Sequence, residues 1–144
     1  PQENGMPTHL RNAISLIIHN PSLASEISAP TAVLASNIPG IELFSQLLLI
    51  CQQQPHLNTG SLLSYWEEHP SRALIGQLAS QEPLIPPEAW RDELIGILDR
   101  LGDRLKEVEI NALMMKASSN TLNDDEKQQL KRLLEGKGKV SNLD

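Results

Sequence analysis

The residues with the greatest potential for chemistry are one cysteine and four histidines, and their spacing does not favour catalysis or metal binding. Cys51 lies on the apolar face of a predicted helix, where a buried, inert thiol is the expected state. The histidines are far apart in sequence, and none has a second ligand at metal-binding spacing; they are His9, His19, His56 and His69. We therefore expect no catalytic residue, no metal site and no cofactor.

Pairs of neighbouring carboxylates are the next candidates, because two such groups can act as a general acid and a general base. They occur at Glu67-Glu68, Asp92-Glu93 and Asp124-Asp125, each at the predicted end of a helix. Acidic side chains near a helix N-terminus interact favourably with the helix dipole. An acid/base pair also needs a cleft, which the sequence does not indicate. Structural roles are therefore the favoured interpretation.

Arg11 offers binding chemistry instead of catalysis. It is one of only two basic residues before residue 86, and it stands beside Leu10 and Ile14 in the sequence. An isolated guanidinium next to apolar side chains is suited to receive the carboxylate of a partner.

The charged residues are distributed unevenly along the 144-residue chain. Residues 1–85 contain 2 basic and 6 acidic side chains, whereas residues 86–144 contain 10 basic and 12 acidic ones. The net charge is −6 and no Lys/Arg cluster is evident, so direct nucleic-acid binding is not expected. The single cysteine fits a reducing cytoplasm, and no apolar run reaches the roughly 18 residues of a membrane span. We expect a cytoplasmic protein without membrane contact.

The first part of the chain predicts a compact helical bundle. Aromatic residues make up only 3% of the composition, so aliphatic residues must build the core, which favours an all-α fold. Thr8 and Thr59 are the predicted N-caps of two of the helices. Apolar periodicity and proline positions predict helices at 8–19, 40–54, 60–68 and 71–80, with two short helices within 21–36.

The second part predicts a long helix followed by a C-terminal helical hairpin. No proline occurs between Pro87 and Ser118, and Gly96 and Gly102 are points at which a long helix would bend or break. Asn123 and Glu126 form a capping box at the start of the last helix. The apolar stripe follows a 3-4 spacing through Trp90, Leu94, Ile97, Leu98, Leu101, Leu105, Val108 and Ala112.

These patterns divide the chain into four predicted regions. Residues 1–7 resemble a linker remnant, 8–85 the bundle, 86–136 the long helix and hairpin, and 137–144 a flexible tail. The hairpin tip leaves apolar residues with little cover, and a tip of this kind can dock into the helices of another protein. The residues at the tip are Leu113, Met114, Met115 and Leu122.

Two sequence strings resemble the C-terminal helicase-binding domain of gammaproteobacterial DNA primase. The strings are LRNAISLIIHNPSLA and NIPGIELFSQLLLICQQQPHLNTGSLLSYW. The family pattern has M-R-x-x-I-x-x-L-x-x-N-P-E-L-A, then L/I-P-G-x-x-L-F, then Q-P-x-L-x-T-G-x-L-L-x-x-Y, and Leu10 replaces the family methionine. The resemblance covers residues 8 to about 135 and is dense over residues 8–66.

The resemblance implies a helical bundle that carries a hairpin on a long helix. It also implies two partners. The replicative hexameric helicase would bind the hairpin, and the bundle would take the acidic C-terminal tail of the single-stranded DNA-binding protein. Primer synthesis would belong to zinc-binding and polymerase domains that this chain lacks. The parent protein would be a nucleotidyltransferase that acts at the replication fork in the nucleoid.

Residues with these binding roles are carried over position by position. The family has a lysine at the position of Gln77, which lowers the positive charge expected there, and Gly136 and Gly138 depart from the family's continuous last helix. The tail-binding residues implied are Thr8, Leu10, Arg11, Ile14, Gln77 and Leu78. For the helicase, the family implies Glu135 and Lys139. The apolar pattern of the hairpin adds Leu113, Met114, Met115 and Leu122 at the tip and Leu130, Leu133 and Leu134 on one side of the last helix.

Two other classes of function are compatible with the residues alone. A structural helical domain of another cytosolic protein would dimerise through the apolar stripe from Leu94 to Val108. A Cys-dependent hydrolase would need a Cys51 that solvent can reach.

Overall fold

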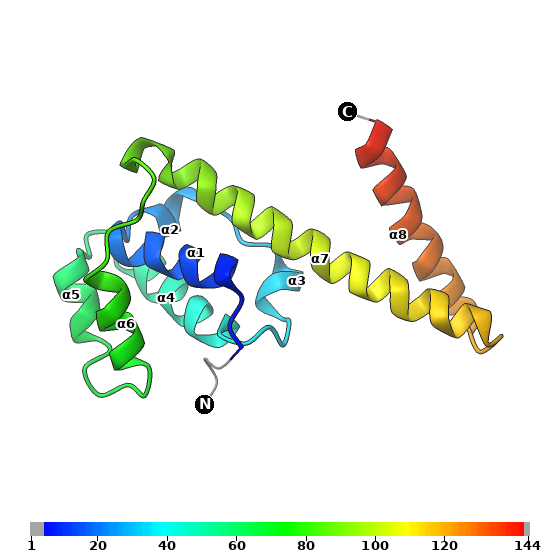
Figure 1. Ribbon diagram of the computed structural model, residues 1–144, viewed down its shortest axis with the longest axis horizontal. Coiled ribbons are helices and arrows are strands. Elements are labelled where there is room, and N and C mark those ends of the chain that lie inside the picture. Colours follow the sequence, from blue (N-terminus) through cyan, green and yellow to red (C-terminus); the bar gives the residue numbers. More distant parts are fainter. Residues whose placement is uncertain (1–4, 143–144) are drawn as a thin grey trace. The chain divides into compact units, whose positions relative to one another are not determined.

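The computed structural model describes the backbone of residues 5–142 and the side chains of residues 5–135. No strand occurs in the described backbone, so the predicted all-α class is confirmed (Figure 1). The elements are α1 (Thr8–His19), α2 (Leu23–Glu26), α3 (Thr31–Leu34), α4 (Ile41–Gln53), α5 (Thr59–Ser64), α6 (Arg72–Ala79), the 3-10 helix η1 (Pro87–Ala89), α7 (Trp90–Ser118) and α8 (Asp124–Asn142).

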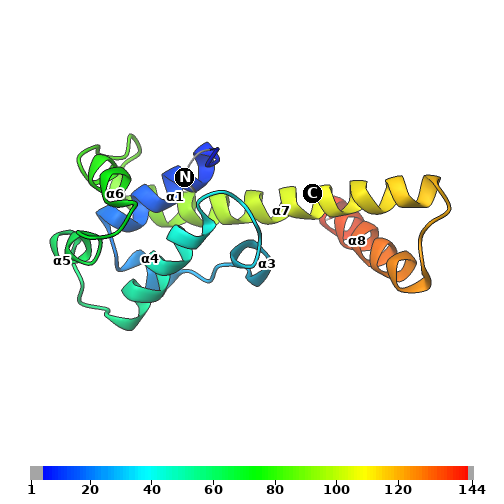
Figure 2. The same cartoon turned by 90° about the horizontal axis from the view of Figure 1, so that it is seen from below.

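Two compact units are present, Pro1–Leu101 and Gly102–Asp144. In the first unit, α4 packs against α1, α2 and α3, and α1 also packs against α5 and α6. Figure 2 shows α5 and α6 side by side within this unit, in agreement with their contacts. The core is aliphatic with one phenylalanine and one tryptophan at its centre, and its fully buried side chains include Leu10, Ile14, Ile17, Phe44, Leu47, Leu62, Trp66, Ile75, Leu94 and Ile97.

Helix α4 begins directly after Gly40, whose backbone conformation is one that other residues rarely adopt. Gly40 has φ +93°, in the left-handed region, and precedes the first residue of α4. A Cβ atom at this position would lie 2.5 Å from Cε of Met6. The left-handed turn therefore requires glycine at residue 40, and a side chain there would in addition displace the end of the Met6 side chain.

Both predicted threonine caps are wrong. The residue before α1 is Pro7 and makes no side-chain cap. The cap of α5 is Asn58, whose Oδ1 accepts a hydrogen bond from the Ser61 backbone N–H at 2.8 Å. The Thr59 hydroxyl instead donates to the Ile18 carbonyl at 2.7 Å, joining α5 to the last turn of α1.

The first turns of α7 are packed into the first unit. Leu94, Ile97 and Leu98 are buried there. The indole N–H of Trp90 donates to the Ile85 carbonyl at 2.9 Å, and its ring lies 6.2 Å from that of His19. The predicted boundary between residues 85 and 86 implies that residues 8–85 fold without α7, and this stays a prediction. The bend or break expected at the α7 glycines does not interrupt the helix, which is a single element of 29 residues.

The second unit is a helical hairpin made by the end of α7 and by α8. Ile110 and Leu113 are its buried apolar residues, whereas Val108 is 61% exposed, so the regular 3-4 stripe does not continue as predicted. The capping box is confirmed: Asn123 Oδ1 accepts from the Glu126 N–H at 2.8 Å, and Glu126 Oε1 accepts from the Asn123 N–H at 3.2 Å. The α8 backbone is helical to Asn142, within the segment predicted to be a flexible tail.

Candidate functional site

The polar face of α1 presents the cation that the sequence singled out. Arg11 is half-buried, and Thr8, Asn12 and Ser15 share its side of the helix through their three- and four-residue spacing. No side-chain hydrogen bond or ion pair joins Arg11 to another residue in the described part of the chain. Its guanidinium therefore retains its full donor capacity for a carboxylate.

The apolar residues predicted to form a notch beside Arg11 are placed in the core instead. Leu10 and Ile14 are both fully buried, and Leu78 of α6 is buried as well. Their side chains thus offer almost no surface to an aromatic ring in this structure. Their role in binding stays a prediction that requires the bundle to open locally.

Helix α6 contributes one accessible residue, Gln77, to the predicted tail-binding residues. Gln77 is exposed, and the carbonyl of Leu78 lies 2.9 Å from His19 Nε2, near the C-terminal end of α1. Since eight residues separate His19 from Arg11, the two ends of this contact zone are about 12 Å apart along α1. The accessible polar groups are therefore spread along the α1 surface rather than gathered in one small pocket.

The hairpin carries the second predicted surface, and much of it is accessible. Met115 is 72% exposed and Met114 about half exposed, whereas Leu113 is buried and serves as hairpin core. Val108 and Leu134 add exposed aliphatic surface. Leu122, Leu130 and Leu133 are partly buried, Glu135 is exposed, and the side chain of Lys139 lies outside the described residues.

The turn of the hairpin is held by a charged and hydrogen-bonded cluster. Lys116 Nζ on α7 pairs with Glu126 Oε2 on α8 at 2.5 Å. The hydrogen bond from Lys116, together with the one from the Asn123 backbone, lowers the pKa of Glu126. One helical turn deeper, Gln129 donates to Glu109. Since these contacts set the pairing of the two helices, they position the exposed methionines.

Residues with catalytic potential are not arranged as an active site in the described part of the chain. Burial raises the pKa of the Cys51 thiol to about 11, so it is neutral at physiological pH and a poor nucleophile. No group of three or more His, Cys, Asp and Glu side chains is placed to hold a metal ion among these residues. Within the same residues no helix is both long and apolar enough to cross a membrane.

Sequence reasoning missed some exposed apolar residues. Val108 fits the spacing of the predicted apolar stripe and yet is exposed, and Leu49 on α4 is exposed as well. Leu84, in the loop before η1, is fully exposed and was not singled out. The position of Leu84 between Pro83 and Ile85, outside any helical period, is the sequence signal that marks it as a loop residue.

Comparison with known proteins identifies the family. The family model described as "DNA primase DnaG DnaB-binding" matches residues 10–133. A DNA primase of Pasteurella multocida is 31% identical over 127 residues, which are 88% of this chain and 22% of that protein. The DNA primase of Escherichia coli K12 is 25% identical over 123 residues, or 85% of this chain and 21% of that protein.

A solved structure agrees in fold. The C-terminal domain of DnaG primase from Vibrio cholerae superimposes with a TM-score of 0.66 and 34% sequence identity. The alignment covers 88% of this chain and 96% of that domain. The chain thus spans about a fifth of the length of the full primases it matches, and nearly all of a primase C-terminal domain.

Proposed function

Since this chain belongs to the DnaB-binding family of DnaG primase, we propose that it holds a primase on the replicative helicase, so that RNA primers are made at the moving replication fork. The observation that carries the proposal is the family match over residues 10–133, which includes most of both compact units. Enzymatic synthesis of the primer belongs to the remainder of the parent protein. This chain supplies protein–protein contacts.

We assign the helicase contact to the hairpin. Its exposed methionines form flexible, polarisable surface that adapts to the side chains of a partner. The hairpin contains equal numbers of basic and acidic residues, 8 of each from residue 102 onward, so association depends on apolar contact more than on long-range attraction. An apolar helical surface rimmed by mixed charges is suited to pack against helices of another protein.

A point substitution in the hairpin tests this assignment. Replacing Met115 by Ser removes exposed apolar surface without touching the hairpin core, and we expect affinity for the cognate DnaB helicase to fall about tenfold. The matched control is Leu49→Ser, because Leu49 is also an exposed aliphatic residue but lies on α4 of the first unit. Calorimetric titration with the hexamer measures both. Equal affinities for the two variants and the wild type would refute the assignment.

We further propose that α1 binds the acidic C-terminal tail of the single-stranded DNA-binding protein, with Arg11 as the carboxylate receptor. The supporting observation is that Arg11 is unpaired within the described residues while it is held half-buried on a rigid helix. Thr8 and Gln77 are exposed and add hydrogen-bonding groups. Because residue 77 is neutral here, binding depends mainly on one cation and is weak and sensitive to salt.

The tail proposal is tested with a peptide that ends in a free carboxylate next to an aromatic residue. A charge-assisted contact contributes about 1.5–3 kcal/mol, so Arg11→Ala lowers affinity roughly ten- to a hundredfold. Arg91→Ala is the matched control, because Arg91 is also in the first unit, is exposed and makes no side-chain hydrogen bond or ion pair with the described residues. Fluorescence anisotropy reports binding. If the two variants bind equally well, Arg11 is not the receptor.

A further inference from the structure

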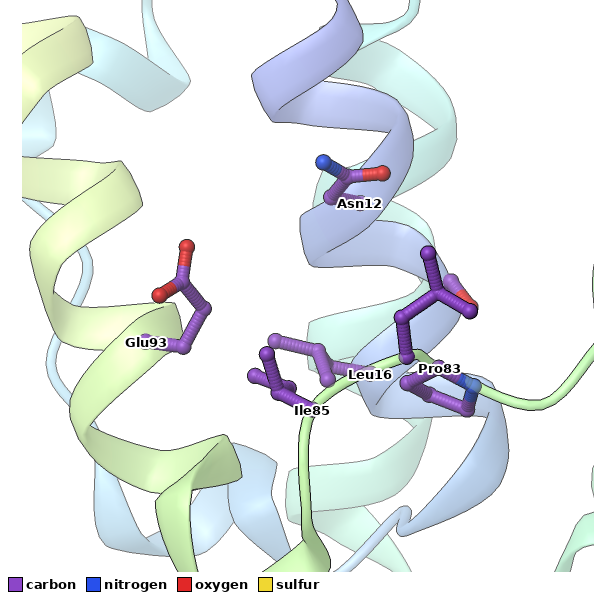
Figure 3. Close-up of a pocket in the computed structure, with 7 residues that line it drawn as sticks. Asn12, Leu16, Pro83, Ile85 and Glu93 are labelled. Carbon is purple, nitrogen blue, oxygen red and sulfur yellow. The ribbon is translucent and has the colours of Figure 1, made fainter.

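A groove of about 300 Å³ lies in the first unit between α1 and the start of α7. Figure 3 shows Asn12 of α1 and Glu93 of α7 on its opposite sides, with Leu16 and Ile85 between them. The loop before η1 closes one end of the groove. The groove is on the side of α1 that faces α7, and the residues assigned to tail binding on α6 do not line it.

The lining combines apolar surface with hydrogen-bonding groups. Pro83, Ile85 and the fully exposed Leu84 supply the accessible apolar part, whereas Leu16 is buried beneath them. Asn12 and Ser15 make no side-chain hydrogen bond within the described part of the chain. A ligand in this groove thus meets aliphatic side chains next to an amide and a carboxylate. Such a lining suits a ligand that has both an apolar and a polar part.

Charge decides which kind of polar group the groove favours. Residues 1–101 contain 4 basic and 10 acidic side chains, so the whole net charge of −6 resides in the first unit. Glu93 is the charged residue that lines the groove. Glu82 directly precedes the lining residue Pro83 in sequence, and its side chain is exposed. Within the lining itself, the Glu93 carboxylate thus favours a ligand that carries a cation.

We propose that this groove binds a short polypeptide segment of a partner protein in which an aliphatic side chain is adjacent to lysine or arginine. The aliphatic group packs against Ile85 and Leu84, and the cation pairs with Glu93. The groove lining contains none of the residues assigned above to helicase or tail binding, and two of its members, Asn12 and Ser15, lie on the same side of α1 as Arg11.

Glu93 already forms an ion pair with Arg100, and this pair predicts how a substitution of Arg100 changes binding. Glu93 Oε1 lies 3.3 Å from Arg100 Nη2, and both side chains are substantially exposed. An exposed pair of this kind is weak and exchanges readily with another cation. Arg100 therefore competes with an incoming lysine for the same carboxylate, so removal of Arg100 strengthens binding of the segment.

Three blocked pentapeptides are the probes: Gly-Lys-Leu-Lys-Gly, Gly-Lys-Ser-Lys-Gly and Gly-Glu-Leu-Glu-Gly. Titration of the 144-residue protein is followed by amide chemical shifts in NMR. We expect the first peptide to shift the amides of Ser15, Leu84 and Glu93, and to bind about fivefold or more tightly than the other two. Shifts confined to other residues, or equal binding of the acidic peptide, would overturn the proposal.

Substitutions then separate this groove from general attraction to an acidic protein. Glu93→Gln lowers affinity for the basic leucine peptide about fivefold, whereas Asp92→Asn, the same change of charge one residue away and outside the lining, leaves it within about twofold. Arg100→Gln raises affinity about two- to threefold. Equal losses for Glu93→Gln and Asp92→Asn, or a loss for Arg100→Gln, would contradict the proposed site.

Discussion

Replacing Ile97 by alanine tests whether the first turns of α7 are part of the bundle core. Ile97 is 0% exposed, whereas Ile95, two residues earlier on the same helix, is 36% exposed. The two substitutions delete the same atoms from the same helix. Any difference between them therefore reports the packing of Ile97 against the bundle rather than the intrinsic preference of α7 for isoleucine or alanine.

The expected destabilisation follows from burial. Deleting a fully buried isoleucine side chain to the β-carbon costs about 2–5 kcal/mol, because lost burial and an unfilled cavity add together. A unit of this size has a free energy of unfolding of about 5–15 kcal/mol. A loss of about 3 kcal/mol lowers the melting temperature by roughly 10–20 °C. Ile95→Ala, at a position that is 36% exposed, removes less buried surface and costs about 1 kcal/mol.

Tryptophan fluorescence is the appropriate assay, because both tryptophans lie in the first unit and the hairpin contributes no signal. Urea unfolding of the wild type and the two variants gives the free energies. If Ile97→Ala unfolds at the same urea concentration as Ile95→Ala, the first turns of α7 do not support the bundle. That result would restore a boundary near residue 85 as the end of the folding unit.

Three further outcomes are expected. The hydrogen bonds from Lys116 and the Asn123 backbone lower the pKa of Glu126, so they stabilise the hairpin fully above the pKa of Glu126 in the unfolded chain. This stabilisation is lost as the pH falls through the lower pKa of the folded state. Far-UV circular dichroism measured below about pH 5 shows the loss, and Glu126→Gln abolishes this pH dependence. Gly40→Ala lowers the free energy of unfolding by about 1–3 kcal/mol, and adding Met6→Ala relieves only the steric part, as urea unfolding measures. The Cys51 thiol, whose pKa is about 11, reacts with a thiol reagent at pH 8 roughly a hundredfold more slowly in the native protein than in urea; equal rates would show that it is accessible.

The helical class and several local features follow directly from the amino-acid sequence. Asn123 and Glu126 were predicted as a capping box, and the structure has both of its hydrogen bonds, because a capping box involves only four consecutive residues. The extent of α1 was likewise predicted from its apolar period and from Pro21. The family was predicted from the ordered series of residues before Tyr65, and the comparisons confirm it.

Which side chains face solvent, and which contacts cross between helices, depends on how the helices pack in three dimensions. Thr59 has a residue type that can cap a helix, but its hydroxyl donates to the carbonyl of Ile18, a residue 41 positions away. Leu10 and Ile14 look like binding residues beside Arg11, yet other helices cover them completely. Periodicity gives the apolar face of a helix, whereas burial depends on the helix that packs there, and that partner is distant in sequence.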